Sequence, residues 1–454
     1  MSEQPRQDRQ GSGSAPTAPS FAPPCGPVLG WRDRAVVRAT GIPYATAERF
    51  QPPAPVPDWQ DPYEATTWSP ACPQGPTPLL DTILGPQLER LGRDEHCQNL
   101  SVTLPPDLAP GESLPVLVWI HGGSYTSGAG DMPITDPAAL VAEQRVVVVA
   151  VTYRLGIFGF LGDGHGRPAN LGLLDQIAAL RWVQRNIAAF GGDPAQVTVF
   201  GESAGGDAAA HLMAVAEAPT LFRRAILQSP PLGIARGRAR MSAAMAAAAA
   251  HVTPEMTAAE VVALQPDVER RAARFGLLAG MPFGTQYGFA PLPAEDEVDA
   301  AWQRVAPAVD VLAGHTTEEA RFFLGRVPVL ARAAGWPVVG RLVTGVVVGY
   351  VTAAVYARGV RAFADRHARA GGRAHHYVVS WSAPGNPYGA AHTIDLPLLF
   401  GDEAAWSTAA LVAGASWAEI DGHARRVRQV WADFARGQLS GSGEIPGVLR
   451  YWPA

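Results

Sequence analysis

The 454-residue chain contains no lysine, so all 36 of its basic residues are arginines. This absence excludes Schiff-base catalysis by a lysine amine and any phosphate-binding loop that depends on a lysine. Runs of basic residues are also missing, and the net charge of −5 argues against nucleic acid as a partner.

Cysteine is scarce as well. The three cysteines, Cys25, Cys72 and Cys97, do not have the spacing of metal ligands, and their odd number leaves at least one thiol free. The cysteines therefore do not predict a metal site, and the serine chemistry inferred below requires neither a metal nor an organic cofactor.

Long apolar runs are few. The run from Leu342 to Val355 is too short for a membrane span and is interrupted by glycine and threonine, so it predicts a buried helix. The first two dozen residues lack the charged-then-apolar order of a secretory signal. We expect a disordered leader over 1–24, a single domain over 25–454, a cytoplasmic location and no membrane partner. The oligomeric state is not predicted.

Strand and helix patterns alternate along the rest of the chain. Hydrophobic residues make up 47% of the sequence, which is enough for a large core. Runs that are apolar on both faces predict a mostly parallel sheet covered by helices on both sides, which is an α/β fold. The predicted strands are 115–120, 146–152, 197–200, 225–228, 309–313 and 375–380, and the predicted helices include 175–186, 353–369 and 420–436.

The most informative motif runs from Gly201 to Gly205, with Ser203 at its centre. An apolar β-branched strand precedes it and a run of helix formers follows it. A serine on such a sharp turn is held in a strained conformation with its hydroxyl exposed, and the flanking glycines keep side chains out of the corner. The pattern therefore predicts that Ser203 is a nucleophile.

A serine nucleophile needs a base, and the base needs an acid that orients it. On a sheet of this kind the acid and the histidine follow the serine, each after a later strand. Glu318 and Glu319 follow the predicted strand 309–313, and His392 ends the loop after strand 375–380. From position alone, His392 is favoured as the base, and either glutamate could be a solvated start of a helix.

The oxyanion of the intermediate would need backbone donors. Strand 115–120 runs directly into His121, Gly122 and Gly123, where adjacent glycines leave N–H groups unobstructed. The N–H of Ala204 would add a third donor. Tyr125, Phe283 and Tyr287 are further candidates for the cleft wall, although buried aromatic residues are more often plain core.

These motifs together resemble the type-B carboxylesterases, the family of the para-nitrobenzyl esterases and cholinesterases. The resemblance extends from about residue 26 to the C-terminus. Its most specific match runs from Asn170 through Phe190-Gly191-Gly192-Asp193-Pro194 to the serine turn. Supporting matches are 41–45, 72–74, 121–123, 153–156, 389–397 and 431–435.

The resemblance implies an α/β-hydrolase fold and a role for each site residue. Ser203 is implied as the nucleophile, Glu319 rather than Glu318 as the acid, and His392 as the general base. It also implies that Gly122, Gly123 and Ala204 are the oxyanion donors. Glu202, beside the nucleophile, is implied as a supporting carboxylate.

The sequence departs from the family pattern at two of the positions near these motifs. Pro230 follows Ser229 where the family has glycine, and Ala320 stands where glycine is usual, so loops that shape specificity are expected to differ. Cys72 and Cys97 lie where the family often has a disulfide. Either a disulfide or a reduced pair fits the sequence.

The sequence is therefore interpreted as a serine hydrolase that cleaves small carboxylic esters to acid and alcohol through an acyl-enzyme. Two alternatives remain. One is an acyltransferase, amidase or lactone-forming enzyme on the same scaffold, and the other is a catalytically inactive binding protein.

Overall fold

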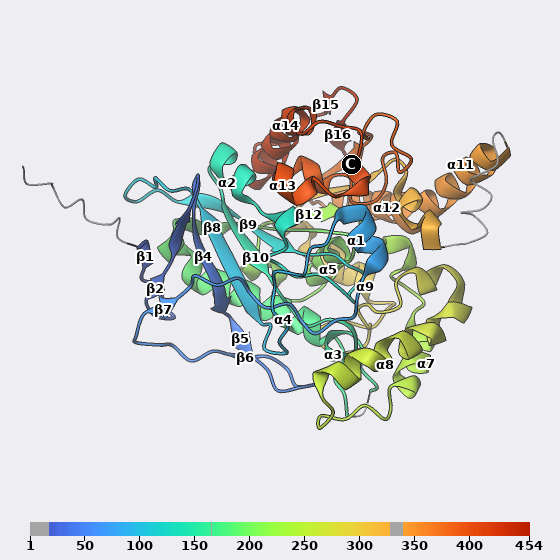
Figure 1. Ribbon diagram of the computed structural model, residues 1–454, viewed down its shortest axis with the longest axis horizontal. Coiled ribbons are helices and arrows are strands. Elements are labelled where there is room, and N and C mark those ends of the chain that lie inside the picture. The colour runs from blue at the N-terminus through green and yellow to red at the C-terminus, as the bar shows by residue number, and fades with distance from the viewer. Residues whose placement is uncertain (1–17, 165, 327–338) are drawn as a thin grey trace, which may run out of the picture.

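A large twisted sheet organises the computed structural model, which describes residues 18–164, 166–326 and 339–454. Within these residues the sheet has eleven strands (Figure 1). Their order across the sheet is β15 (Gly443–Ile445), β16 (Leu449–Pro453), β14 (Ala374–Val379), β13 (Asp310–Thr316), β12 (Arg224–Gln228), β11 (Gly192–Glu202), β9 (Leu114–Ile120), β10 (Val147–Val151), β8 (Asn99–Leu104), β4 (Val36–Pro43) and β3 (Trp31–Asp33).

The six central strands, from β14 to β10, run parallel, as the apolar runs predict. Every residue of β9 and β10 is buried, which explains why both strands are apolar throughout. The strands at both edges pair antiparallel instead. Five short strands and the short helix α3 (Gly156–Gly159) lie outside the large sheet in the described residues. The strands are β1 (Ser20–Phe21), β2 (Val28–Leu29), β5 (Ala45–Thr46), β6 (Ala54–Pro55) and β7 (Tyr63–Glu64).

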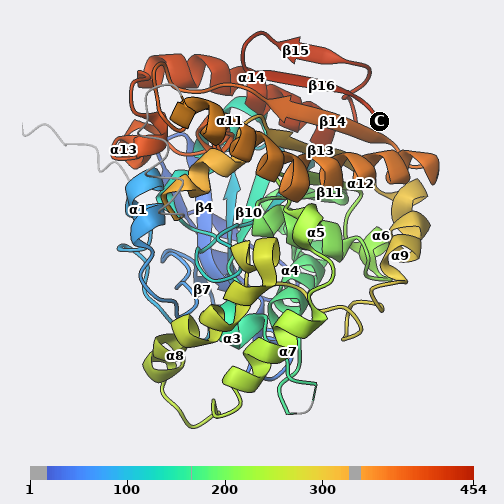
Figure 2. The same ribbon diagram turned by 90° about the vertical axis from the view of Figure 1, so that its right-hand side faces the viewer.

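Helices cover both faces of the sheet, as expected (Figure 2). On one face, α2 (Ala138–Gln144) packs against β4 and β8, and α14 (Trp417–Ala435) packs against β9 and β11. On the other, α4 (Leu171–Asn186) and α5 (Ala204–Leu212) pack against β11, and α12 (Arg358–Arg369) packs against β13 and β14. The described residues also form the α-helices α1 (Pro78–Leu84), α6 (Ala218–Leu221), α7 (Ala239–Ala248), α8 (Ala258–Arg270), α9 (Val298–Val305), α11 (Val339–Val351) and α13 (Glu403–Trp406).

The structure has a strand within the predicted leader of residues 1–24. Strand β1 (Ser20–Phe21) pairs antiparallel with β2, and the ring of Phe21 lies 4.6 Å from that of Phe190. The aromatic anchor outweighs the polar composition of this stretch. The rest of the predicted leader, residues 1–17, lies outside the described residues.

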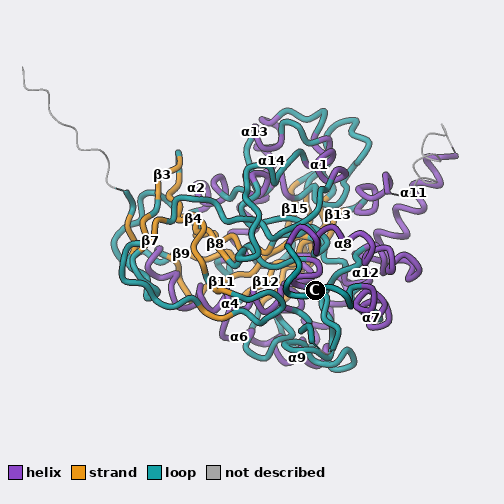
Figure 3. Tube along the Cα trace, turned by 60° about the horizontal axis from the view of Figure 1, so that its bottom comes forward, coloured by secondary structure: helices purple, strands orange, loops and turns teal. Residues whose placement is uncertain are grey.

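The prediction of a buried helix over 342–355 is wrong for its first half. Helix α11 projects from the body in two different views (Figures 1 and 3), and Leu342, Val346 and Tyr350 are 68%, 72% and 61% exposed. A π-helical segment, 352–357, then joins α11 to α12. The helical stretch Leu342–Arg369 is long and apolar enough to cross a membrane by length and composition, with 33% of its apolar window buried. The helical spacing of apolar residues does not indicate which apolar helix faces pack against the rest of the protein.

Helix α4 is tied to the loop after β10 by a buried ion pair. Arg154 donates from Nε and Nη2 to the two carboxylate oxygens of Asp175, at 2.8 and 2.7 Å. The two side chains are 4% and 0% exposed. A buried charge that loses its partner is strongly destabilising, so this pair holds α4 on the sheet.

We expect Asp175→Ala to lower the free energy of unfolding by about 3–5 kcal/mol, because it strands the Arg154 guanidinium in the core. Urea unfolding followed by circular dichroism measures this change. Glu217→Ala is the control, because it removes the partner of exposed Arg181 on the same helix. It should cost less than about 1 kcal/mol. Equal losses in the two variants would contradict the assignment.

Candidate active site

Ser203 occupies the turn between β11 and α5 with φ 58° and ψ −123°. Its N–H donates to the carbonyl of Gln228 on the next strand, at 2.8 Å. The turn brings strand and helix so close that a Cβ on Gly205 would lie 2.0 Å from the carbonyl oxygen of Ile120. Glycine at this position is therefore a steric requirement of the turn, as the motif predicts.

Glu319 and His392, predicted from separate strand ends, meet in the structure. Their side chains join through Nδ1 and Oε2 at 2.5 Å. The other oxygen of Glu319 accepts the N–H of Thr316 at 2.7 Å, which fixes the carboxylate. Glu318 instead pairs with Arg321 and accepts the N–H of Ala390 at 3.2 Å. Of the two candidate acids, only Glu319 contacts His392.

A second carboxylate approaches the opposite side of the imidazole. Oε1 of Glu202 lies 3.2 Å from Nε2 of His392. Burial lowers the pKa of the imidazole, but the charges of Glu202 and Glu319 outweigh burial and raise it above its usual value. Burial raises the pKa of Glu202 to about 8, against the opposing effect of His392. The pKa of Glu319 stays low despite burial, because the imidazole stabilises its anion.

Asp395 is a further buried carboxylate near this cluster, and sequence reasoning did not assign it a role. Its Oδ2 accepts the Nε2–H of Gln228 at 2.6 Å, and burial raises its pKa to about 6. The backbone of Gln228 also accepts the N–H of Ser203, so this glutamine links the two sides of the site. The signal was present in the sequence, since Asp395 stands three residues after His392.

One pocket, whose empty space of about 780 Å³ includes volume open to solvent, contains the predicted nucleophile and the predicted base. Ser203, His392 and Glu202 line it together with Gly122 and Gly123. Its remaining wall is largely apolar and includes Leu80, Leu84, Leu88, Trp119, Met132, Ile134, Phe322, Phe323 and Leu396.

The predicted oxyanion residues lie against the serine turn. A Cβ on Gly122 would be 2.7 Å from the carbonyl oxygen of Glu202 and 3.2 Å from Cβ of Ser203. Gly123 has φ 105°, which favours glycine, and Ala204 is the first residue of α5. Backbone N–H groups from this loop and from a helix N-terminus are suited to bind a negative oxygen.

His121, the residue before the glycine pair, supports the glycine loop through its buried side chain. It is fully buried, its Nδ1 lies 2.8 Å from the carbonyl oxygen of Gly122, and its ring stacks on Tyr153 at 4.3 Å. Burial lowers the pKa of His121 to about 4, so this histidine is neutral at pH 7.

The aromatic residues predicted for the cleft wall lie elsewhere. Tyr125 is buried and donates to Asp207, Phe283 belongs to the core, and Tyr287 lines a separate cavity beside α7. The imidazole of His392 is instead surrounded by three other rings, which sequence reasoning missed. Their centroids lie 5.1–5.8 Å away, and they belong to Phe322, Phe323 and Tyr356.

The departures from the family pattern have specific outcomes. Ser229 takes φ 45°, whereas Ala320 does not take a positive φ, so alanine fits that turn without strain. Cys72 and Cys97 are buried free thiols. The sulfur of Cys72 accepts the N–H of Leu155 at 3.3 Å, so the structure has the reduced pair and not the possible disulfide.

This arrangement defines a class of protein. A serine on a strained strand-to-helix turn, a histidine held by a glutamate, and a glycine loop after a parallel strand are the parts of a serine hydrolase with the α/β-hydrolase fold. Among the described residues, no group of three or more histidine, cysteine or acidic side chains is placed to hold a metal ion.

Comparisons with known proteins give the family. The model of the carboxylesterase family matches residues 18–329. A probable N-octanoylanthranilate hydrolase of Rhodococcus erythropolis is 37% identical over 420 residues, covering 90% of this chain and 92% of the relative. The para-nitrobenzyl esterase of Bacillus subtilis is 45% identical over 231 residues, or 49% of this chain and 45% of that protein.

The solved structures agree. A thermophilic para-nitrobenzyl esterase superimposes with a TM-score of 0.77 at 29% identity, covering 95% of this chain and 94% of its own. The chain belongs to the carboxylesterase family, and it is a carboxylic ester hydrolase. The fold and the family inferred from the motifs are thus confirmed.

The two carboxylates around His392 predict the direction of a pH shift. Catalysis needs a neutral imidazole, so activity falls as pH drops through the pKa of His392. Glu202→Gln removes one of the charges that raise this pKa, so the acid limb of kcat/KM should move to lower pH. A pH profile with a soluble para-nitrophenyl ester measures it. A limb that stays in place or moves to higher pH would contradict the electrostatic role of Glu202.

Gly122→Ala should lower kcat by about 100-fold or more, because the added Cβ would push the loop away from the serine turn and misplace an oxyanion donor. Gly280→Ala is the control, since a Cβ there meets nothing within 4 Å. Initial rates at saturating ester, with circular dichroism to verify folding, make the comparison. Comparable activity in the two variants would exclude the close approach of Gly122.

Proposed function

We propose that Ser203 is the nucleophile of this ester hydrolase, His392 its general base and Glu319 the acid that orients the base. Gly122, Gly123 and Ala204 donate N–H groups to the oxyanion. The observation that carries the proposal is the 2.5 Å contact between Glu319 and His392, at the wall of the cavity that Ser203 also lines.

The chemistry follows from these positions. The imidazole takes the proton of Ser203 as its oxygen attacks the ester carbonyl, and the oxyanion donors stabilise the tetrahedral intermediate. The imidazolium then protonates the leaving alcohol, and water repeats the sequence to release the acid. Glu319 stabilises the imidazolium and holds the ring with Nδ1 protonated. When it is ionised, Glu202 adds a second negative charge near the same cation.

The cavity favours uncharged, apolar substrates. Its wall is largely aliphatic and aromatic, and Asp81 and Glu202 are the acidic residues in its lining. None of the described residues that line it is an arginine, so no guanidinium there would pair with an anionic substrate. Neutral esters of small or medium size are the proposed substrates, with water as the acyl acceptor.

Aromatic amides are a second candidate class, suggested by the Rhodococcus relative, whose name states that it hydrolyses N-octanoylanthranilate. That substrate joins an acyl chain to an aromatic amine that carries a carboxylate. The absence of arginine in the described cavity lining argues against the carboxylate but not against the amide. Comparing octanoyl anilide with its carboxylated analogue and with phenyl octanoate separates these substrates.

Para-nitrophenyl butyrate mixed with stoichiometric enzyme should give a burst of nitrophenol that Ser203→Ala abolishes, because acylation precedes the slower release of acid. Rapid-mixing absorbance measures the burst. Retention of most of the activity by the variant would end the assignment of the nucleophile.

Labelling with a fluorophosphonate probe tests the inactive-scaffold alternative. The native chain should be labelled at Ser203, whereas a catalytically inactive scaffold would stay unlabelled. Added alcohols and amines test the acceptor: an acyltransferase would divert most of the acyl group to them even at low concentration, and a hydrolase would release mainly acid.

A further inference from the structure

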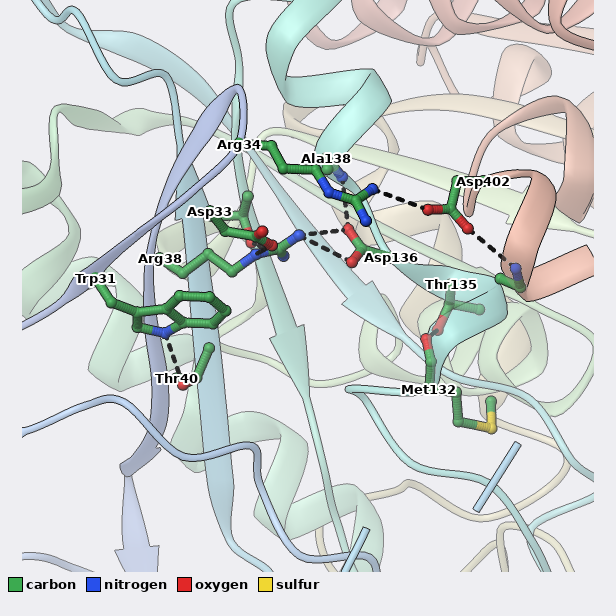
Figure 4. Close-up of polar contacts among 12 residues, drawn as sticks. Trp31, Asp33, Arg34, Arg38, Thr40, Met132, Thr135, Asp136, Ala138 and Asp402 are labelled. Carbon is green, nitrogen blue, oxygen red and sulfur yellow. Dashed lines mark hydrogen bonds and ion pairs between the residues drawn. The ribbon is translucent and has the colours of Figure 1, made fainter. Parts of the chain in front are cut away.

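Arg38 on β4 is a buried cation at the edge of the sheet, 1% exposed, and it lies outside the catalytic machinery (Figure 4). Its Nε donates to Asp33 at 2.7 Å, and its Nη1 donates to Thr103 at 3.2 Å. Its Nη2 donates to both carboxylate oxygens of Asp136, at 2.9 and 2.8 Å. One guanidinium thus joins two carboxylates that are far apart in sequence.

Aromatic rings hold the guanidinium in place. It lies 5.2 Å from the ring of Trp68 and 5.9 Å from that of Trp31, within the range of cation–π attraction. The indole of Trp31 is itself fixed by a hydrogen bond to Thr40 (Figure 4). Arg38 therefore has a defined position against which Asp136 is placed.

Asp136 links Arg38 to a short helical turn, η1 (Pro133–Thr135), because this turn ends at Asp136. The same carboxylate accepts the N–H of Ala138 at the start of α2, at 2.8 Å. The carbonyl of Asp136 accepts the N–H of Gly401 at 2.9 Å. The turn is thus anchored to β4, to α2 and to the segment before α13.

The turn forms one wall of the active-site cavity. Met132, Ile134 and Thr135 line this cavity, whereas Arg38 and Asp136 do not. The N–H of Ile134 donates to Gln87, which lines the cavity beside α1. The ion pair therefore stands directly behind residues that face the substrate.

The chemistry indicates which part of the substrate this wall meets. The imidazole must protonate the leaving oxygen, so the alcohol arm lies on the side of His392. The turn η1 packs against η8 (Leu396–Leu398), which closely follows His392 in the chain, and Leu396 lines the same cavity as Ile134 and Thr135. The wall formed by η1 therefore faces the alcohol arm.

We propose that the Arg38–Asp136 ion pair is a positioning device that sets how long an alcohol this esterase accepts. The proposal rests on the proposed function, because it takes His392 as the group that protonates the alcohol. With the pair intact, η1 is held and the wall is rigid. Without it, the turn moves outward and longer alcohols fit.

Two aspartates on the same guanidinium provide a matched test. Asp136→Ala removes the carboxylate that belongs to the cavity wall at η1. Asp33→Ala removes a carboxylate that binds the same guanidinium but is not part of this wall. The two side chains are similarly exposed, at 31% and 28%, but Asp136 accepts two hydrogen bonds from Arg38 and one from Ala138, whereas Asp33 accepts one from Arg38. kcat/KM is measured for acetate esters from ethyl to octyl, and for para-nitrophenyl esters of acids from acetic to octanoic. Thermal unfolding is recorded for both variants.

Asp136→Ala should raise kcat/KM for octyl relative to ethyl acetate about fivefold, a change typical of altered pocket contacts. Asp33→Ala should leave this ratio at the native value, and the acyl series should be unchanged in both. Equal ratios in the two variants, or a shift confined to the acyl series, would overturn the proposal. If Asp136→Ala does not fold, Asp136→Asn, which keeps an acceptor for Ala138, is measured against Asp33→Asn with the same criteria.

Inactivity of native protein toward all esters, or full activity of Ser203→Ala, would instead contradict the proposed function. The two failures are therefore distinct.

Discussion

The active site depends on holding three buried ionisable groups together. Within the described part of the chain, His392 is the basic side chain that contacts both Glu319 and Glu202, and each of the three side chains is at most 3% exposed. A buried carboxylate without a partner would be expensive, so the imidazole and the acids require one another. The elements that carry them, β11, η6 (Glu319–Arg326) and the loop after β14, are thereby fixed in one arrangement.

The backbone geometry of the site depends on close approach between neighbouring segments of the chain. The strained turn at Ser203 exists only because Gly205 lets α5 lie against the end of β9, and Gly122 lets the next loop touch the same turn. Parallel strands place all of these ends on one edge of the sheet. The chemistry is thus assembled by packing rules that act on residues far apart in sequence.

Much of this arrangement could be predicted, because local patterns carry it. Apolar runs marked the central strands, and glycine spacing with strand ends marked Ser203, Gly122, Glu319 and His392 as site residues. What failed depended on partners distant in sequence. The exposure of α11, the ring of Phe21 that orders the first strand, and the choice of Phe322 over Phe283 beside the cavity are decided by tertiary packing. The spacing of apolar residues in the sequence does not determine such tertiary packing.

The composition of the cavity wall also affects how the acid product leaves the active site after each turnover. Each cycle creates a carboxylate beside Ser203, in a space where Asp81 is acidic and the described lining offers no guanidinium. Ionised Glu319 lies behind His392 and offsets the charge of the imidazolium when that ring is protonated. The newly formed anion therefore meets no uncompensated cation in the described lining, and we expect the acid product to bind weakly and to compete little with the next ester.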